Sequence, residues 1–500
     1  SGYKTENHAL GFALRNGDRL LDLKVGFQHI PEQGFPNQHM DMTDNRSTQI
    51  NLGYTGKFAW GALQARVYQE QTRHQMDFAG DKLYWYGATH NVAGMPMDTR
   101  GNNTGVAVKA EVTLSERDLV RLGSEYQRYR LDDWWAPVAN SMMMSPNTFW
   151  NINNGQRDRL DLYGEWEAQW TPRWLTLAGV RGSLVKMDAG TVQGYNTVAM
   201  MYGNDAARFN ASNRRRNDDN LDLSALARFT PDAGQAYAGG YSRKTRSPSL
   251  YERYTWSTNG MAMTMNNWVN DGNGYVGDVN LKPEVAHTLS VTADWHDPTG
   301  TVWGLSATPY YSRVDDYIDA RCLTTCTARQ FNTLKLINRD ARLFGVDFAA
   351  FFPIARSTSL GHFTGRGVVS YVDGQPRGGS DHLYNIMPLN ARLAVEHRLG
   401  NWTNTVESHL VSAKTRVSQV RNEMKTPGYG LLNLRSSYEH KQFRVDIGLE
   451  NALNKQYSLP LGGAYIGQGA TMSLNGAGAP YGLPVPGMGR SLYAGVSVKF

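Results

Sequence analysis

The feature that most restricts how this 500-residue chain can fold is a period-two alternation of apolar and polar side chains. Residues 443–450 read Phe-Arg-Val-Asp-Ile-Gly-Leu-Glu, and similar alternation occurs in 161–170 and in 491–500. A helix groups apolar residues three and four positions apart, whereas successive side chains of a strand point to opposite faces. The chain is therefore predicted to be all-β.

The connections between these strands follow a second pattern, in which short turns alternate with long segments. The long segments lie at about 29–45, 73–102, 131–156, 187–217, 246–283, 314–340, 374–382, 415–428 and 451–489. Outer-membrane β-barrels have short periplasmic turns and long extracellular loops, and a pair of soluble all-β domains has no reason to share this arrangement. We therefore expect a transmembrane antiparallel β-barrel, forming one domain over residues 1–500.

The number of connections also predicts the size of the barrel. Nine short and nine long connections join 19 strands, whereas bacterial single-chain barrels have an even number. The first strand, at about 7–15, leads into a short turn and so runs towards the periplasm. If it is the fourth strand, the full barrel has about 22 strands, the size of plugged outer-membrane transporters. We expect about strands 4–22 here, with the plug and first strands outside this sequence.

Composition agrees with a barrel and argues against other membrane proteins. The mean hydropathy is −0.50, and no apolar stretch approaches the roughly 18 residues that a membrane-spanning helix needs. The chain nevertheless contains 13 Trp, 26 Tyr and 16 Phe. Only alternate residues of a barrel strand face lipid, so a strand can be rich in aromatic residues while its average hydropathy stays low.

Charge and motifs exclude two broad classes of function. The net charge is +6, but the basic residues are dispersed, and the one run of arginines, 214–216, stands beside Asp218 and Asp219. This pattern is typical of solvated loops, so no nucleic-acid partner is expected. The sequence contains no GxSxG, HExxH or nucleotide-binding motif, so we do not expect an enzyme.

The chain has two cysteines, Cys322 and Cys326, in one long segment. In an exported protein this spacing favours a disulfide that closes a small loop. A metal-binding pair is the weaker alternative, because no histidine or further cysteine lies nearby in the sequence.

Four segments resemble the TonB-dependent outer-membrane receptors. They are 241–251 (YSRKTRSPSLY), 280–284 (NLKPE), 445–457 with its ending ENALNKQY, and the terminal strand that ends in Phe500. The resemblance implies a plugged barrel in the bacterial outer membrane, surrounded by lipid and lipopolysaccharide. It also implies active import powered through an inner-membrane TonB complex.

The N-terminal third resembles one subgroup of that family, the outer-membrane copper receptors OprC and NosA. The segments that carry the resemblance are 33–42 (QGFPNQHMDM), 60–63 (WGAL), 74–78 (HQMDF) and 84–86 (YWY). That subgroup pairs a CxxxM motif in the plug with an HxM motif in the barrel. The resemblance therefore implies that His74 and Met76 are metal ligands.

The distribution of methionines independently favours a soft metal. Of 18 methionines, 17 fall in the long segments, and only Met387 falls in an expected strand. Several are spaced by two, including 261, 263 and 265, and in an extended segment this spacing points sulfurs to one side. Thioethers select Cu(I), whereas Mg²⁺ and Ca²⁺ prefer oxygen ligands. We therefore expect copper as the transported ligand, with His74 and Met76 as the main candidate ligands.

Weaker candidate ligands stand near this pair in the sequence. Met95 and Met97 lie in the same long segment as the pair, and His39 with Met40 lies in the preceding long segment. The alternative for most loop methionines, especially those at 142–144, is packing of loop against loop.

A receptor for a ferric siderophore or haem is the alternative function, with Trp134, Trp135 and the arginines 214–216 as candidate contacts. A passive porin is disfavoured by the expected strand number. Metal analysis distinguishes a copper receptor from a siderophore or haem receptor, because a copper receptor should carry copper and not an iron chelate.

Overall fold

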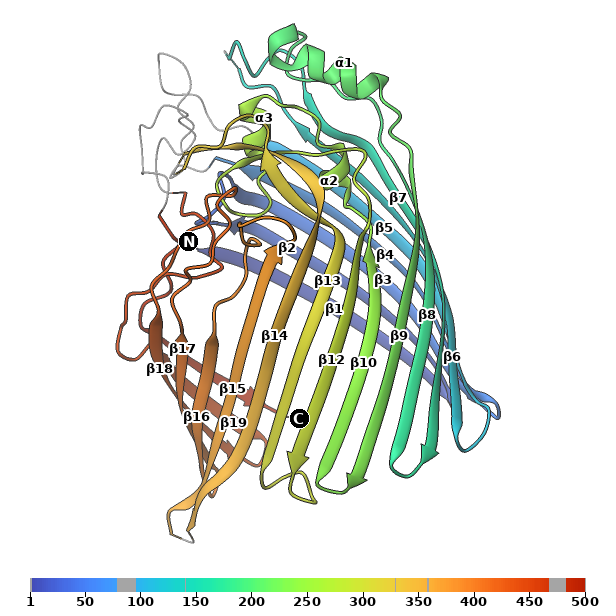
Figure 1. Cartoon of the computed structure of the whole chain (residues 1–500), viewed down its shortest axis with the longest axis vertical. Coiled ribbons are helices and arrows are strands. Elements are labelled where there is room, and N and C mark those ends of the chain that lie inside the picture. Colours follow the sequence, from blue (N-terminus) through green and yellow to red (C-terminus); the bar gives the residue numbers. More distant parts are fainter. Residues whose placement is uncertain are drawn as a thin grey trace.

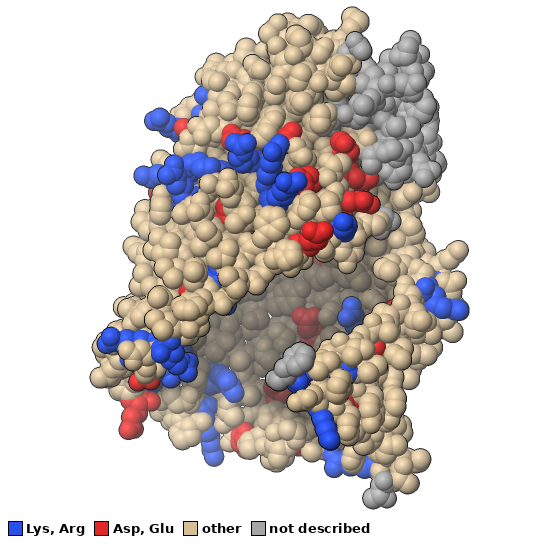
Figure 2. All heavy atoms as spheres, turned by 180° about the vertical axis from the view of Figure 1, so that it is seen from behind, with Lys and Arg blue, Asp and Glu red and all other residues tan. Residues whose placement is uncertain are grey.

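The computed structural model of the chain describes residues 2–78, 96–139, 141–328, 330–357, 359–466 and 483–499. In this part of the chain the strands form one curved 20-stranded sheet (Figure 1), and the space-filling view from behind shows that the molecule is hollowed (Figure 2). No helix in the described ranges is long and apolar enough to cross a membrane.

The strands run in chain order and most are long. Their bounds are β1 (Tyr3–Asn16), β2 (Arg19–Gln33), β3 (Asp41–Phe58), β4 (Gly61–Asp77), β5 (Met97–Thr113), β6 (Asp118–Trp135), β7 (Phe149–Thr171), β8 (Trp174–Asp188), β9 (Arg216–Asp232), β10 (Gln235–Arg246), β11 (Gly274–Val276), β12 (Glu284–His296), β13 (Gly304–Cys322), β14 (Thr333–Ser357), β15 (Gly361–Pro376), β16 (Asn390–Leu399), β17 (Trp402–Val411), β18 (Tyr429–His440), β19 (Phe443–Glu450) and β20 (Ser491–Val498). Short helices occur only in the long connections of the described chain: the π-helical turn η1 (Ala199–Gly203), α1 (Asn204–Ala211), α2 (Leu250–Tyr254) and α3 (Gly260–Met265).

Each long strand pairs antiparallel with the next one along the chain. The exception is β11, which has three residues and pairs parallel with β14 above the wall. The other 19 strands form the wall, and the prediction of an antiparallel barrel built from strands and alternating connections is confirmed. Among the described residues β1 and β20 are the two edges of the sheet, and no pairing joins them.

In the described chain the long connections lie at the end of the sheet where the helices gather, and the short turns lie at the other end (Figure 1). We call the first end the loop rim. The full strand number expected from the sequence stays a prediction.

The wall has an apolar band that faces outward. In β3 to β6 the register aligns Leu52, Val67, Val106 and Tyr126 in one row, and all four side chains are exposed. Exposed apolar side chains in a row across neighbouring strands are typical of a surface that faces lipid. Towards the loop rim the same outward faces become polar, which marks the upper limit of this band.

Most wall strands are longer than the roughly 9–11 residues that cross a bilayer, and β4, for example, has 17. Their excess length continues above the apolar band to the loop rim. The expectation that methionines avoid strands is therefore wrong: Met42, Met76, Met97 and Met187 lie in strands, and Met387 lies outside them. The inward face of the wall is polar, as shown by Tyr68, which donates a 2.8 Å hydrogen bond to Glu125.

The largest apolar core lies at the loop rim and not inside the wall. It joins the ends of β4 to β8 to the loops between β6 and β7, β8 and β9, and β10 and β12. At its centre Phe149 stacks between Trp135 and Trp256, with ring centroids 4.2 and 5.0 Å away. This core fixes the loops over the ends of β3 to β7, where the candidate site lies.

A candidate metal site at the loop rim

His74 and Met76 lie near the end of β4 and share its inward face. The two positions follow Tyr68 along the strand in steps of two, and successive strand residues alternate between faces. The outward positions between them and the apolar band are Gln69, Gln71 and Arg73, which are exposed. The pair therefore stands above the lipid band and faces the interior, as expected for residues that meet a solute in the lumen.

His74 belongs to a polar row that crosses four strands. Its neighbours in register are Asn45 on β3 and Thr99 on β5, and Thr99 is opposite Asp133 on β6. His74 Nδ1 lies 3.2 Å from Asn45 Oδ1. Burial lowers the pKa of His74, so the imidazole is neutral at physiological pH and can present a ring nitrogen to a metal.

Asp133 closes the other end of this row and is fully buried. It accepts hydrogen bonds from Trp135 Nε1 at 3.0 Å and Asn151 Nδ2 at 2.8 Å. Burial raises the pKa of Asp133 to about 6 despite these donors. The row therefore contains a carboxyl group that can exchange a proton near neutral pH, two strands from His74.

Met76 belongs to the next row, which is made of thioethers. It is opposite Met42 on β3 and Met97 on β5, and only 7% of Met76 is exposed. Directly opposite residues have Cβ atoms about 4.5–5.5 Å apart, so flexible methionine side chains in such a row can bring their sulfurs together. Met40 is buried in the same apolar cluster as Met76, and Met97 packs against that cluster.

The structure thus brings together His74, Met76, Met97 and Met40, which the sequence had singled out. His39 is buried beside Met40 in the connection between β2 and β3. Met95 lies outside the described residues, so its place as a ligand stays a prediction.

Met42 was missed as a candidate ligand. The signal in the sequence was the Met40-Asp41-Met42 alternation, but its position opposite Met76 depends on the register of β3 and β4. A bulge between Met42 and Asp44 shifts that register by one residue. Asp41 adds a further constraint, because its Oδ1 accepts a 2.6 Å hydrogen bond from the Phe35 backbone N–H and so holds the preceding turn.

Other loop methionines separate into packed and exposed groups. Met144 and Met265 are buried in the rim core, as expected for packing of loop against loop, and Met187 joins the same core from the end of β8. Met142 and Met200, in contrast, are 89% and 91% exposed. The expected extended spacing of residues 261, 263 and 265 is wrong, because these residues form α3, with Asn259 as its N-cap.

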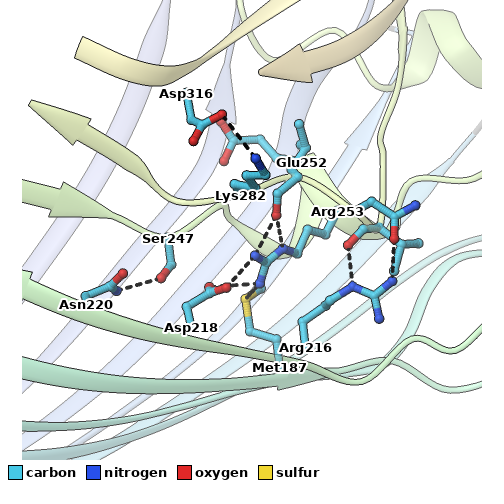
Figure 3. Close-up of polar contacts among 12 residues, drawn as sticks. Met187, Arg216, Asp218, Asn220, Ser247, Glu252, Arg253, Lys282 and Asp316 are labelled. Atoms are coloured by element: carbon cyan, nitrogen blue, oxygen red, sulfur yellow. Dashed lines mark hydrogen bonds and ion pairs between the residues drawn. The ribbon is translucent and has the colours of Figure 1, made fainter. Parts of the chain in front are cut away.

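A buried ion pair between α2 and β9 holds the loop that connects β10 and β12 (Figure 3). Arg253, on α2, donates hydrogen bonds to both carboxylate oxygens of Asp218, at 2.7 and 3.0 Å, and its Nη1 lies 3.0 Å from Met187 Sδ. It also donates to the Leu281 carbonyl at 2.7 Å. Burial and the nearby Asp133 carboxylate raise the pKa of the neighbouring Tyr251, which places this loop beside the row that contains His74.

The tryptophans and arginines predicted as contacts for a siderophore or haem can also be placed in the structure. Trp135 is fully buried in the rim core. Arg214 donates to the backbone carbonyls of Ala189 and Asn210, and Arg216 donates to the Val279 carbonyl and Asn280 (Figure 3). The contacts of Arg214 and Arg216 hold loops in place, whereas the Arg215 side chain is 86% exposed and pairs with Asp188 at 3.3 Å.

Cys322 and Cys326 are joined by a disulfide, with their Cα atoms 5.5 Å apart. The bridge closes a small turn at the end of β13. Both cysteines pack against a second apolar cluster, which includes Ile318 on β13 and Leu334 on β14. It lies apart from the cluster that contains Met76.

The chemistry of the donors at the site is that of a soft metal. In the described ranges no group of three or more His, Cys, Asp and Glu residues could hold a metal ion. The thioether row with the adjacent imidazole is a donor set of a different kind, which suits Cu(I) and contains none of the oxygen ligands that Ca²⁺ and Mg²⁺ require.

Comparison with known proteins agrees with the fold. Two curated relatives are "Heme/hemopexin utilization protein C" from Haemophilus influenzae strains, each 26% identical over 246 or 237 residues. The match covers 44% of this chain, and the chain spans only 33% and 32% of the length of these relatives.

Solved structures align with nearly all of this chain. "Copper transporter OprC" has a TM-score of 0.80 at 16% identity and covers 100% of this chain and 74% of its own. An FrpB iron transporter from Neisseria meningitidis has a TM-score of 0.67 at 15% identity, with 99% and 71% covered. At these identities the likeness shows the fold alone.

The family match is more extensive than any of these pairwise sequence matches. Residues 1–452 match the family described as "TonB dependent receptor-like, beta-barrel". That family and the similar structures are receptors and transporters, in agreement with the expectation that the chain is not an enzyme. The chain belongs to the TonB-dependent receptor β-barrel family of outer-membrane proteins.

Proposed function

We propose that this barrel belongs to an active importer of copper ions, energised through TonB, that takes up copper as Cu(I). The observation that carries the proposal is the thioether row Met42, Met76 and Met97, with His74 on the same inward face. Two or three thioethers with one neutral imidazole match the ligand preferences of Cu(I). Copper is the transported substrate here and not a resident cofactor.

The position of the row supports transport rather than storage. Its side chains point into the lumen from the ends of strands, which are held by the sheet and by the rim core. Rigid strands keep donors at fixed separations, which favours a specific metal site. A plug inside the barrel would meet this row and could supply further ligands, as the resemblance to the copper receptors implies.

Import of haem or a ferric siderophore is the alternative, and one observation favours it. The curated relatives at 26% identity are named for haem and hemopexin utilization, although this chain covers 33% of the first of them. Against this alternative, Trp135 and the arginines at 214 and 216 are engaged in packing and in bonds to backbone carbonyls.

Metal analysis of the full receptor tests the proposal. The receptor is purified from outer membranes, loaded with Cu(I) under reducing conditions, and its metal content is measured by mass spectrometry. We expect stoichiometric copper in the native protein and a loss of at least tenfold in affinity in Met76→Leu, which removes sulfur but keeps apolar volume. Met142→Leu is the matched control, because Met142 is an exposed methionine outside the row.

The outcomes separate the two functions. Copper retained equally by the native protein and the Met76→Leu and His74→Ala variants contradicts the assigned site. A native receptor without copper but with a haem absorption band, or with bound ferric chelate, contradicts the copper function and supports the alternative.

A further inference from the structure

The thioether row ends at an aromatic ring, that of Trp135. In the ladder between β5 and β6, Met97 is directly opposite Trp135, so the row of sulfurs continues on β6 as an indole. Trp135 is two residues from Asp133, which faces the interior, and successive strand residues alternate between faces. Trp135 therefore lies on the same inward face as the thioethers and borders the proposed copper site.

The orientation of the indole ring follows from its stacking partners. Phe149, which is opposite Trp135 on β7, stacks on it with ring centroids 4.2 Å apart and planes 7° from parallel. Trp256 continues the stack beyond Phe149, with its centroid 5.0 Å from that ring. Because one face of the Trp135 ring is covered from β7, its other face is turned towards β5, where Met97 lies.

Two further features hold the ring in this orientation. Trp135 Nε1 donates a 3.0 Å hydrogen bond to Asp133 Oδ1, which fixes the edge of the indole. Trp135 is 0% exposed and belongs to the same apolar cluster as Met76, and Met97 packs against this cluster. A ring that is hydrogen-bonded at its edge and stacked on one face keeps its second face towards the thioether row.

An indole face is a suitable neighbour for a univalent cation in a dry site. The π system carries negative charge on its face, and Trp attracts cations more strongly than Tyr or Phe, most of all where water is excluded. Cu(I) is soft and univalent, so thioethers and an aromatic face suit it. A divalent ion loses more when its water is replaced by an uncharged ring, because the cost of removing an ion from water rises with its charge.

We propose that Trp135 caps the Cu(I) held by the thioether row with the face of its indole that is turned towards β5. Trp135 is then a specificity-determining residue, which favours a univalent soft ion over divalent metals. The inference rests on the proposed copper function and adds a residue to the same site. Packing of methionine sulfur against the ring is the alternative use of these neighbours, and it would place no ion at the indole.

The test is fluorine nuclear magnetic resonance on the full receptor labelled with fluorotryptophan. The protein is titrated with Ag⁺, a stable univalent substitute for Cu(I), and separately with Zn²⁺. The resonance of Trp135 is identified as the one that disappears in Trp135→Phe, and that of Trp134 is identified from Trp134→Phe. Trp134 is the matched control, because it lies on the opposite face of β6, with the Arg100 guanidinium carbon 5.8 Å from its ring centroid.

We expect stoichiometric Ag⁺ to shift the resonance of Trp135 and to leave that of Trp134 in place, whereas Zn²⁺ should shift neither. The affinities for Ag⁺ and Cu(I), measured by competition with a chelator, should fall about thirtyfold in Trp135→Leu, the size of a cation–π contact away from water. Trp135→Phe keeps a weaker ring and should lose about fivefold. Trp134→Leu should bind both ions as the native protein does.

Two results would overturn the cap and leave the copper function standing. One is a native receptor that binds Ag⁺ stoichiometrically while the Trp135 resonance does not move, and the other is equal affinity for Ag⁺ in Trp135→Leu and the native protein. A native receptor that binds neither Ag⁺ nor Cu(I) would instead contradict the proposed function itself. If Trp135→Leu does not fold, the resonance of the native protein and the affinity of Trp135→Phe decide between the cap and simple packing.

Discussion

Arg253→Met is expected to loosen the loop between β10 and β12 without opening the wall. The side chain of Arg253 is 1% exposed and that of Asp218 is 5% exposed, so this variant leaves a carboxylate buried without its cation. Breaking a buried ion pair from one side costs about 3–5 kcal/mol. The Leu281 carbonyl also loses the donor that lies 2.7 Å away.

Hydrogen exchange measured by mass spectrometry gives the free energy of local opening for residues 247–283. We expect this free energy to fall by about 3–5 kcal/mol in Arg253→Met, while peptides from β1 and β2 keep their protection. The double variant Arg253→Met/Asp218→Leu removes both charges and should recover most of the loss. A residual cost of about 1–3 kcal/mol should remain, because the Leu281 carbonyl still lacks its partner.

Two results would refute this reasoning. A change below about 1 kcal/mol in the single variant would mean that the ion pair does not hold the loop. A double variant as unstable as the single one would mean that the loss came from packing around α2, and not from the unpaired carboxylate.

Three further predictions concern the site and the loops. His74→Ala and Met76→Leu together should abolish stoichiometric Cu(I) binding by the full receptor, measured by metal analysis, while the electrophoretic mobility of the folded barrel is unchanged. Cys322→Ser/Cys326→Ser should lower the opening free energy of residues 323–332 by about 2 kcal/mol, from the loop entropy of a short bridge, measured by hydrogen exchange. Burial raises the pKa of Asp133 to about 6, so the stability contributed by its protonated form is complete below about pH 4 and is lost as the pH rises through 6. The hydrogen-exchange protection of residues 131–135 should therefore fall over this pH range in the native protein. In Asp133→Asn, which does not titrate there, the protection should stay constant.

The architecture was predictable because it is encoded locally. Alternation within 443–450 or 161–170 is visible without knowing any partner strand, and loop lengths are read directly along the chain. The structure has 19 wall strands with long connections at one end, as these patterns indicated.

The upper ends of the strands were not predictable in the same way. Residues 69–77 read Gln-Glu-Gln-Thr-Arg-His-Gln-Met-Asp, which is polar on both faces because one face meets water and the other meets the lumen. Without alternation such a segment resembles a loop, although it continues β4. The same reason placed Met42 and Met97 in expected loops, whereas both lie in strands.

The composition of the site depends on register, which one sequence does not contain. The sequence could show that His74 and Met76 share a face, because they are two residues apart. The row of Met42, Met76 and Met97 forms only with one particular register of three strands, which includes a bulge in β3.

The candidate copper site uses only the inward faces of its strands. On β4, Arg73 faces outward while His74 and Met76 face the lumen, and on β5, Arg100 faces outward while Met97 and Thr99 face inward. A change of side chain on one face leaves the backbone pairing of the strand intact, because the ladder uses only main-chain groups. Met76→Leu should therefore lose copper, whereas Arg73→Gln, which changes an outward residue of the same strand, should keep it. Equal loss of copper in both variants would point to a disturbed strand register and would remove support for the inward site.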